Sequence, residues 1–414
     1  MTVTSSRRCR FCHEPLSTTL VDLGKTPLAN SYLTREQLAA SEPVYPLVAR
    51  VCSACRLVQV DDAAPPDDIF RDYAYFSSYS TSWVEHARQF ARMAGERWHL
   101  GRDSRVIEVA SNDGYLLRHF VDMGVPVLGV EPAANVAAVA RAGGVPTDVS
   151  FFGRATAERL RAGGYSADLI VGNNVFAHVP DINDFVAGFA ILLKPDGVVS
   201  LEFPHVMKLI EMTQFDTIYH EHFSYLSLHT TEKILGAHGL TVFDVAELPT
   251  HGGSLRVMAA RTSSQAPAAG DGLAKVRRDE AASGVDSDAC YMGFESRVRT
   301  IRKALLNFLR SAKAEGKSVA AYGAAAKGNT LLNYCGIGTE LVDYVVDISP
   351  HKQGLFLPGS RLPIYAPSKL AETKPDYVLI LPWNLKDEII GQIHHVRDWG
   401  GRFMIAVPTL TVLP

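Results

Sequence analysis

Residues 105–114 read Arg-Val-Ile-Glu-Val-Ala-Ser-Asn-Asp-Gly, and this stretch decides the fold of the central part of the chain. Its first half is apolar apart from Arg105 and Glu108, which predicts a buried strand, and its small, polar second half predicts a turn into a helix. Small residues such as Ala110 and Gly114 let the backbone approach a ligand, and the following helix N-terminus offers free N–H groups. The stretch therefore predicts a ligand-binding strand–turn–helix unit.

Strands and helices alternate on both sides of this unit. We expect helices over 115–123 and 185–193, the second ended by Lys194-Pro-Asp-Gly197, and strands over 127–130, 168–171 and 198–203. The segments 241–245 and 254–259, around His251-Gly-Gly253, are expected to form a closing antiparallel pair. This alternation is typical of a parallel α/β sheet.

The second predicted strand ends at Glu131-Pro132, about 20 residues after the turn, where a carboxylate can accept both hydroxyls of a ribose. A dinucleotide would need the glycine-rich G-x-G-x-x-G turn, which Ala110 and Ser111 do not supply. The pattern therefore counts against a dinucleotide. We expect the cofactor-binding residues to be Glu108, Ala110, Asn112, Asp113, Gly114, Glu131 and Pro132, with Asn174 after a later strand.

Two cysteine pairs, Cys9-Arg-Phe-Cys12 and Cys52-Ser-Ala-Cys55, flank one segment near the N-terminus. Each pair supplies two thiolates on a tight turn, and four thiolates suit a tetrahedral Zn²⁺ in a closed site that builds a domain without doing chemistry. Together with His13, the first pair also matches the C-x-x-C-H pattern of covalent haem attachment. That chemistry requires export and leaves the second pair unexplained. The spacing predicts zinc.

Composition narrows the class of protein. The chain has 414 residues, enough for two or three domains. Its formal net charge of −3 lacks the excess of positive charge that is typical of nucleic-acid-binding proteins. No apolar run approaches the about 20 residues of a membrane span, and residues 1–10 show no secretory signal. Paired cysteines without an export signal indicate a reducing compartment, so we expect a cytoplasmic protein without nucleic-acid or membrane partners.

A second α/β unit follows the small, polar stretch 262–272 and a helix whose apolar residues, from Phe294 to Phe308, recur at spacings of four and three. Strands are expected over 318–322, 341–347, 377–381 and 403–407. The turn Gly323–Gly328 offers backbone donors for a diphosphate, and Lys327 adds charge. Asp347 ends the next strand, in the position of a ribose or base contact. A degenerate Rossmann-like scaffold that only packs fits this pattern too.

Longer motifs carry a resemblance to a known family. Glu108-x-x-x-x-Asp113-Gly114, Glu131-Pro132 and Leu193–Gly197 resemble the motifs of class I S-adenosylmethionine methyltransferases. The whole chain resembles the sugar C-methyltransferases with an N-terminal zinc-binding domain, in particular the branch that methylates C-3 in tetronitrose biosynthesis. The motifs behind this resemblance are the paired cysteines, Phe76-Ser-Ser-Tyr79, Asn174–His178, Gln214–His222 and Thr250–Arg256.

The resemblance implies an α/β protein of three domains. These are a zinc-binding domain over 1–70, a class I methyltransferase (Rossmann-like) domain over 71–262, and a second Rossmann-like domain over 263–414 that binds the sugar nucleotide. The implied cofactor is S-adenosylmethionine. The implied substrate is a dTDP-linked 4-keto deoxysugar, methylated at C-3, next to the ketone, in deoxysugar and antibiotic biosynthesis.

That chemistry needs a base for the acidic C–H bond and donors for the oxygen that becomes negative. In Tyr219-His220-Glu221-His222, an extended chain would place His220 with His222 on one face and Tyr219 with Glu221 on the other. We expect His222 to be the base, since neutral imidazole titrates near the working pH. Glu221 or Tyr219 would orient it or touch the sugar. A His-x-His pair also fits a second metal site.

His178 follows a strand at the carboxyl edge of the sheet, where ligands of open α/β sheets bind, and is expected to stabilise the enolate oxygen. Tyr73, Tyr75 and Tyr79 are alternatives, although these tyrosines equally fit a cover over the mouth of the sheet. The substrate residues are expected to be Phe76, Ser77, His251, Lys327, Asn329 and Asp347. His251-Gly-Gly253 also fits a simple hairpin turn.

Two other classes of function fit parts of the pattern. Two Rossmann-like units suit an NAD(P)-dependent sugar-nucleotide oxidoreductase, because Glu131 can hold a ribose in either cofactor. A zinc module also suits a non-catalytic binding protein. The near-neutral charge and the Tyr-His-Glu-His cluster count against the latter.

Overall fold

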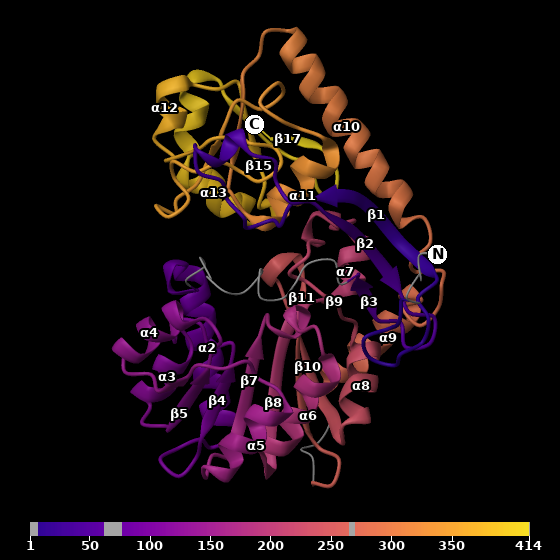
Figure 1. Cartoon of the computed structure of the whole chain (residues 1–414), viewed down its shortest axis with the longest axis vertical. Coiled ribbons are helices and arrows are strands. Elements are labelled where there is room, and N and C mark those ends of the chain that lie inside the picture. The colour runs from indigo at the N-terminus through magenta and orange to yellow at the C-terminus, as the bar shows by residue number, and fades with distance from the viewer. Residues whose placement is uncertain (1–6, 62–76, 265–269, 414) are drawn as a thin grey trace.

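The computed structural model describes residues 7–61, 77–264 and 270–413, which form three units, each built around its own sheet. In Figure 1 the C-terminal unit lies above the central unit, and the N-terminal sheet lies at the side, between them. No helix among these residues is long and apolar enough to cross a membrane.

The N-terminal unit is an antiparallel sheet with the order β1-β2-β3-β9. Strand β2 (Tyr45–Val51) leads through the second cysteine pair into β3 (Val58–Val60). Strand β9 (Ser224–Tyr225) comes from the central part of the sequence, directly after the Tyr-His-Glu-His motif. Pairing with β3 therefore ties that motif to the N-terminal unit. The other elements are β1 (Thr18–Thr26) and the 3-10 helix η1 (Gln37–Ala39).

The central unit is a seven-stranded sheet with the order β10-β11-β8-β7-β4-β5-β6. Strands β6, β5, β4, β7 and β8 are parallel, and β11 is antiparallel to both β8 and β10. The predicted parallel sheet with a closing antiparallel pair is thus confirmed. The strands are β4 (Val106–Val109), β5 (Val127–Val130), β6 (Thr147–Asp148), β7 (Ala167–Asn173), β8 (Leu193–Pro204), β10 (Leu240–Leu248) and β11 (Ser254–Arg261).

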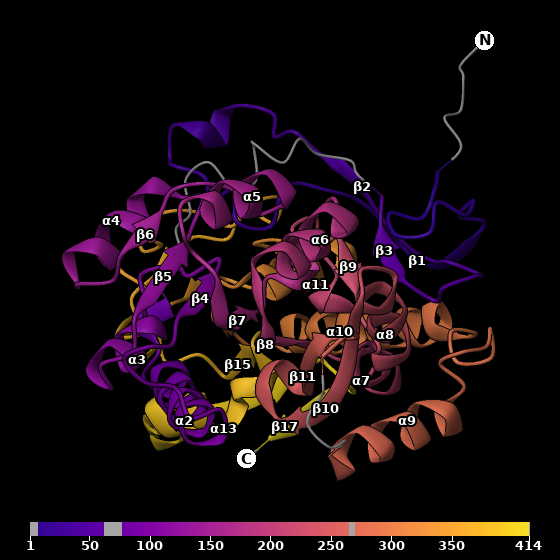
Figure 2. The same ribbon diagram turned by 90° about the horizontal axis from the view of Figure 1, so that it is seen from below.

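Helices cover both faces of this sheet, with α2 and α3 on one and α5 and α6 on the other (Figure 2). Helix α2 begins after Ser80, whose hydroxyl accepts the Trp83 N–H, and it buries Ala87, Phe90 and Ala94 at spacings of three and four. The helices are α2 (Thr81–Arg97), α3 (Leu117–Asp122), α4 (Ala134–Ala142), α5 (Arg154–Ala162), α6 (Ile182–Leu192), α7 (Val206–Glu211), α8 (Leu228–Ala237) and α9 (Asp271–Ser283), with short 3-10 turns η2 (Ser77–Tyr79), η3 (Phe176–His178), η4 (Phe215–Thr217) and η5 (Thr250–Gly252).

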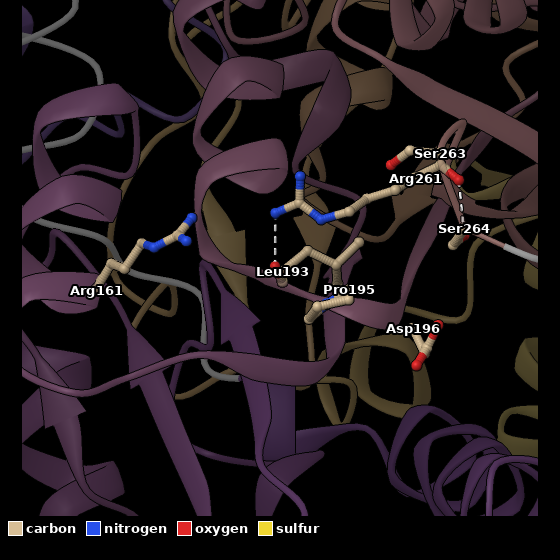
Figure 3. A pocket seen from close by; sticks show the side chains of 7 residues that line it. All are labelled: Arg161, Leu193, Pro195, Asp196, Arg261, Ser263 and Ser264. Carbon is tan, nitrogen blue, oxygen red and sulfur yellow. Dashed lines mark hydrogen bonds between the residues drawn. The ribbon is translucent and has the colours of Figure 1, made fainter.

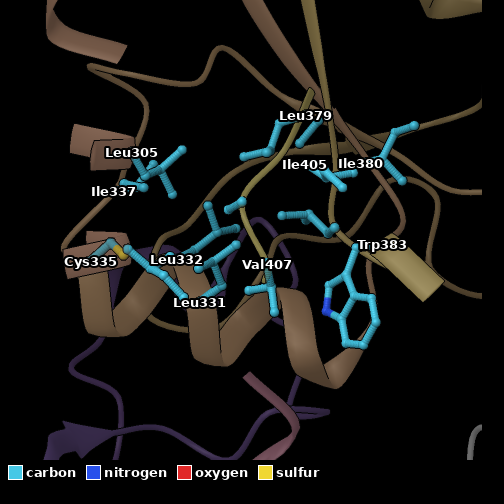
Figure 4. Close-up of a cluster of buried hydrophobic side chains, with 14 of the residues drawn as sticks. Leu305, Leu331, Leu332, Cys335, Ile337, Leu379, Ile380, Trp383, Ile405 and Val407 are labelled. Atoms are coloured by element: carbon cyan, nitrogen blue, oxygen red, sulfur yellow. The ribbon is translucent and has the colours of Figure 1, made fainter. Parts of the chain in front are cut away.

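The C-terminal unit is a six-stranded sheet with the order β14-β13-β12-β15-β16-β17, parallel except at β17. Its core gathers leucines and isoleucines of the strands against α10 and α11, with Trp383 at one end (Figure 4). Its elements are β12 (Val319–Tyr322), β13 (Val345–Val346), β14 (Ile364–Tyr365), β15 (Tyr377–Ile380), β16 (Arg402–Ile405), β17 (Thr411–Leu413), α10 (Phe294–Ala314), α11 (Ala326–Cys335), α12 (Lys369–Thr373), α13 (Lys386–Gln392), η6 (Trp383–Leu385) and η7 (His394–Trp399).

Two predictions for the C-terminal unit need adjustment. The expected strand over 341–347 shrinks to β13, because the Leu341 and Val342 amides both donate to the Gly338 carbonyl and form a turn. The stripe on α10 is present, but Leu309 is fully buried where Phe308 was expected to continue the stripe. Phe308 instead packs edge-on against Tyr377, with ring centroids 5.0 Å apart.

Candidate active site

The Tyr-His-Glu-His motif forms a tight turn and not an extended segment. The His222 N–H donates to the Tyr219 carbonyl at 3.0 Å, which closes the turn. The turn brings the Tyr219 hydroxyl within 2.7 Å of His222 Nε2, and the ring centroids lie 4.1 Å apart. His220 lies elsewhere, with Nε2 3.1 Å from the Pro46 carbonyl oxygen. The prediction that His220 shares a face with His222 is therefore wrong, because a turn lacks the two-residue repeat of a strand.

His222 is neutral and has a defined tautomer. Burial lowers its pKa well below the usual value, and the neighbouring His178, His251 and Lys327 lower that pKa further. Its ring also donates to the backbone carbonyl of Thr217, which engages the single N–H of a neutral imidazole. Nε2 therefore carries a lone pair, which accepts the hydrogen bond of the tyrosine hydroxyl in the turn.

His178 faces His222 from η3, beyond the carboxyl end of β7, at the predicted edge of the sheet. The two ring centroids lie 4.6 Å apart, with the ring planes almost perpendicular at 85°. Burial lowers the pKa of His178 to about 4, opposed by a hydrogen bond from its ring to the backbone of Glu221. A neutral imidazole has one N–H, and here the Glu221 carbonyl engages it.

His251 approaches the same place from η5. Its backbone is left-handed, with φ of 55°, and the next residue, Gly252, has φ of 87°. A Cβ on Gly252 would lie 2.4 Å from Cη2 of Trp383, so only glycine allows this contact between the central and C-terminal units. The His251 ring meets Trp83 edge-on, with centroids 5.6 Å apart. Burial lowers the pKa of His251 to about 4.

Lys327, in the first turn of α11, reaches this site from the C-terminal unit. Its Nζ donates to Asn384 Oδ1 at 2.7 Å and lies 5.1 Å from the ring centroid of Trp383. The indole N–H of Trp383 donates in turn to Asp216 Oδ2 at 2.7 Å. Burial lowers the pKa of Lys327, opposed by the charge of Asp216. The structure thus brings together four residues predicted from the sequence: His178, His222, His251 and Lys327.

The N-terminal unit holds the other side of the Tyr219–His222 turn. Asn30 Nδ2 donates to Glu221 Oε1 at 2.7 Å, and Val60 N–H donates to the Phe223 carbonyl at 3.1 Å. Burial raises the pKa of Glu221 to about 7, although the hydrogen bond from Asn30 opposes this shift. The sequence carried no signal for Asn30, which lies in an irregular segment between β1 and η1.

The predicted cofactor residues gather at the carboxyl ends of β4 and β5. Glu131 Oε2 accepts the Asn112 N–H and Oε1 accepts the Ala133 N–H, both at 2.9 Å. The backbone is left-handed at Ala110 and Asn112, with φ of 56° and 50°. Glu131 therefore braces a strained loop, and strain of this kind concentrates at ligand sites. Pro132 follows Glu131 and precedes Ala133, the N-cap residue of α4.

The loop is acidic and has unused polar atoms. Burial, together with Glu131 and Asp113, raises the pKa of Glu108 well above its usual value. Among the described residues, Asp113 Oδ1 and both amide atoms of Asn174 are buried without a hydrogen-bond partner. Such atoms suit the hydroxyl and ammonium groups of S-adenosylmethionine, so the residues fit that cofactor. Gly114 also belongs here: a Cβ there would lie 3.0 Å from Val145 Cγ2.

Other predicted residues lie in different surroundings. The Ser77 N–H donates to Asn112 Oδ1 at 3.0 Å, so this segment contacts the cofactor loop. Asn329 is buried, and its Nδ2 donates to the Ala29 carbonyl at 2.5 Å. Asp347 Oδ2 accepts the Ala324 N–H at 2.7 Å. Tyr73, Tyr75 and Phe76 lie outside the described residues, as does the side chain of Tyr79, whose backbone lies in η2.

Sequence reasoning missed a buried ionic cluster around Glu202 on β8. Glu202 is fully buried, and its carboxylate lies 2.5 Å from Arg256 Nη2 and 2.9 Å from His86 Nε2. Thr250 Oγ1, next to His251, donates to it at 3.1 Å. Burial would raise the pKa of Glu202, but His86 and Arg256 hold that pKa below its usual value. The sequence feature that could have revealed this cluster was Glu202 itself, a single acidic residue inside the apolar strand predicted over 198–203.

The four predicted zinc ligands converge. Their sulfur atoms all lie within 4.8 Å of one another, with Cys9–Cys55 at 3.5 Å and Cys12–Cys52 at 3.4 Å. A tetrahedral site with Zn–S bonds of about 2.3 Å would separate its sulfurs by about 3.8 Å, so the cluster fits zinc with little movement. Gln59 Nε2 donates to Cys9 Sγ at 3.2 Å, a contact that favours a thiolate.

A surface depression elsewhere on the central unit has no part in this site. Figure 3 shows its lining, with Arg261 Nη2 donating to the Leu193 carbonyl at 2.7 Å. Arg161 likewise donates to the Ile191 carbonyl at 2.7 Å. Both arginines therefore cap the last turn of α6. Because β8 begins at Leu193, the depression lies at the amino ends of the parallel strands, opposite the histidines.

Family models match nearly the whole chain. A zinc binding domain matches residues 9–70, a methyltransferase domain 83–245, and a "C-methyltransferase C-terminal domain" 249–408. The C-methyltransferase NovU of Streptomyces niveus is 37% identical over 410 residues, covering 98% of this chain and 96% of NovU. A ubiquinone biosynthesis O-methyltransferase of Bartonella bacilliformis is 30% identical over 96 residues, 23% of this chain and 39% of the relative.

Among solved structures, the magnesium protoporphyrin IX methyltransferase of Synechocystis PCC 6803 with bound SAH is 14% identical. It covers 43% of this chain and 83% of its own, with a TM-score of 0.36. The full-length match to NovU and the three domain matches favour methyl transfer over the oxidoreductase and non-catalytic alternatives. The chain belongs to the family of S-adenosylmethionine-dependent C-methyltransferases that carry an N-terminal zinc-binding domain.

Proposed function

We propose that this enzyme methylates C-3 of a dTDP-linked 4-keto deoxysugar, the carbon next to the ketone, in deoxysugar or antibiotic biosynthesis. The observation that carries the proposal is the Tyr219–His222 pair, which faces His178 at the carboxyl edge of the central sheet. A C–H bond beside a ketone is acidic enough for such a base.

The cofactor would be held by the loop after β4. Glu131 would accept the ribose hydroxyls, and Asp113 and Asn174 would use their unpartnered buried atoms for the polar groups of the amino-acid end. When bound, S-adenosylmethionine supplies an electrophilic methyl group.

The base is His222 Nε2, acting directly or through the Tyr219 hydroxyl bonded to it. The low pKa of His222 keeps the ring neutral at neutral pH, which is the form that can accept a proton. The hydrogen bond to Thr217 fixes the tautomer, so the lone pair stays on Nε2. His178 packs against this ring and would define the position of the sugar.

The nucleotide part of the substrate would lie against the C-terminal unit. The first-turn amides of α11, a helix of 10 residues, are free to bind a phosphate because a helix leaves its first N–H groups unpaired. Zinc in the N-terminal unit would be structural. It stabilises the sheet that pairs with β9 and so supports the catalytic turn.

The direct test is to incubate the protein with labelled S-adenosylmethionine and a panel of dTDP-linked ketosugars, and to locate the label by NMR. We expect label on the carbon next to the ketone. Label on oxygen or nitrogen, or transfer only to sugars without a ketone, would contradict the proposed reaction.

A further inference from the structure

Lys327 places a positive charge beside His222 and His251 without a carboxylate bound to it, and its side chain is partly buried. Among the described residues its Nζ donates to the neutral amide of Asn384 at 2.7 Å, and no ion pair holds it. Asp216 acts on it only at longer range, and its Oδ2 is already used by Trp383. Even partial burial of an ammonium without a partner charge is costly, so such a group is normally kept to meet an anion.

The position of Lys327 is set by packing on both sides. Its charge lies 5.1 Å from the Trp383 ring, and the same ring closes on the Gly252 backbone, beside His251. The helix that carries it, α11, packs on the segment leading to the catalytic turn, where Thr330 Oγ1 donates to the Ile218 carbonyl at 3.0 Å. The charge of Lys327 therefore lies close enough to His222 and His251 to lower the pKa of both rings.

The imidazoles nearest the base cannot serve a negative oxygen well. His178 and His222 are neutral, and each uses its single N–H on a backbone carbonyl, of Glu221 and Thr217 respectively. The Tyr219 hydroxyl is engaged with His222 Nε2. Among these groups only Lys327 combines a positive charge with N–H donors to spare, since an ammonium has three.

We infer that Lys327 is a catalytic residue that stabilises the oxygen anion formed from the substrate ketone. This inference rests on the proposed function. It transfers the oxyanion role expected for His178 to a residue of the C-terminal unit, and it gives Lys327 a role other than diphosphate binding.

The step balances without any further reactant. The C–H bond next to the ketone breaks and its proton goes to the Tyr219–His222 pair. The electron pair of that bond forms a C=C bond, and the carbonyl π electrons move onto oxygen, where the ammonium of Lys327 faces the new negative charge. The C=C electron pair would then bond to the methyl group of S-adenosylmethionine, the broken S–C bond would leave its electron pair on sulfur as S-adenosylhomocysteine, and the C=O bond would form again.

Proton exchange at the acidic carbon isolates this step. A dTDP-linked 4-keto-6-deoxyhexose is incubated in D₂O with enzyme and S-adenosylhomocysteine, and loss of the C-3 proton signal is followed by NMR. We expect Lys327→Met to slow exchange about 100-fold, as loss of one oxyanion donor does in other enzymes, and Lys327→Arg to recover part of the rate. The dissociation constant of dTDP, measured by calorimetry, should stay within about twofold of wild type.

Lys317→Met is the matched control, because Lys317 is an exposed lysine of the same unit, paired with Asp376. Zinc content and the unfolding temperature report whether each variant folds. If the Lys327→Met variant exchanges the C-3 proton at the wild-type rate, the inference is overturned while the proposed function stands. A loss of dTDP affinity equal to the loss of exchange would overturn the inference as well, since that result assigns Lys327 to the diphosphate. Absence of exchange in the wild-type enzyme would overturn the proposed substrate, and the inference with it.

Discussion

In both the central and the C-terminal unit, a carboxylate accepts an N–H from the loop after the first strand, an arrangement that we call a carboxylate brace. The two units differ in what lies beside this brace. In the central unit Glu131 accepts the N–H of Asn112 from the loop after the first strand of the unit, and in the C-terminal unit Asp347 accepts that of Ala324. Each acid also accepts an N–H two residues further along its own chain. The brace therefore follows from the strand–loop–helix–strand topology and does not itself identify a ligand site.

The two loops face different partners. The central loop carries polar side chains, and its Asp113 Oδ1 is buried without a partner in the described part of the chain. In the C-terminal loop, Gly323–Ala325, the side chains are apolar, and the Ala324 carbonyl accepts the Tyr32 hydroxyl at 2.6 Å and Lys352 Nζ at 2.8 Å. One loop is thus left open for a cofactor, while the other is partly used to dock the N-terminal unit.

The largest effect is expected where the chemistry is assigned to the central unit. His222→Asn should lower turnover about 1,000-fold, because it removes the lone pair that accepts the proton. Binding of S-adenosylmethionine and of dTDP, both measured by calorimetry, should be unchanged. Near-normal turnover would reject His222 as the base and leave the assignment of chemistry to the central unit without support.

Zinc removal tests whether the N-terminal unit supports the catalytic turn. Cys55→Ser should release the metal, measured by elemental analysis, and cost about 4 kcal/mol or more in stability, since a closed thiolate site contributes to folding. Turnover should fall with it, because β9 pairs with β3 of that unit. Cys290→Ser is the control, as this cysteine lies outside the cluster. Wild-type protein without zinc would refute the assignment.

The matched pair Glu131→Gln and Asp347→Asn separates the two braces. Glu131→Gln should weaken S-adenosylmethionine binding about 10- to 100-fold, because an amide has one acceptor oxygen where the carboxylate has two. Asp347→Asn should leave that affinity unchanged and weaken dTDP binding only a few-fold. Calorimetric titration of both variants with both ligands checks this. Equal effects on S-adenosylmethionine would mean that the units do not divide the ligands in this way.

The smallest effect concerns pH. Burial raises the pKa of Glu221 to about 7, so the carboxylate is ionised above that pH and becomes protonated below it. If the ionised form is the active one, turnover should fall about tenfold for each pH unit below the pKa. The pKa of His222 lies too low to produce this fall in turnover, the acidic limb of the pH profile. Glu221→Gln should abolish the limb, and its persistence in that variant would assign it to another group.

Much of the fold could be predicted from local pattern. The apolar run with its small-residue turn identified β4 and the cofactor loop, and the acid about 20 residues later identified Glu131. The stripe beginning at Phe294 identified α10. These features could be predicted because they depend on residues that are close together in the sequence. This holds for the periods of strands and helices and for the spacing within one strand–turn–helix unit.

The candidate site was less accessible. The sequence named His178, His222, His251 and Lys327, but the geometry of the Tyr219–His222 pair was misjudged, because the backbone turn that joins them has no two-residue repeat. Asn30 had no signal, since its partner Glu221 lies 191 positions away. Contacts of this range depend on how the units pack.

The sequence by itself determined the four candidate zinc ligands, the strand and helix periods and the family of the enzyme, because cysteine spacing and residue chemistry do not depend on how the units pack. Only the tertiary structure decided that one site draws its histidines from the central unit, its lysine from the C-terminal unit and a supporting amide from the zinc-binding unit. The physical reason is that burial, hydrogen bonding and charge proximity arise when distant segments exclude water together, and these set the protonation state on which the chemistry depends.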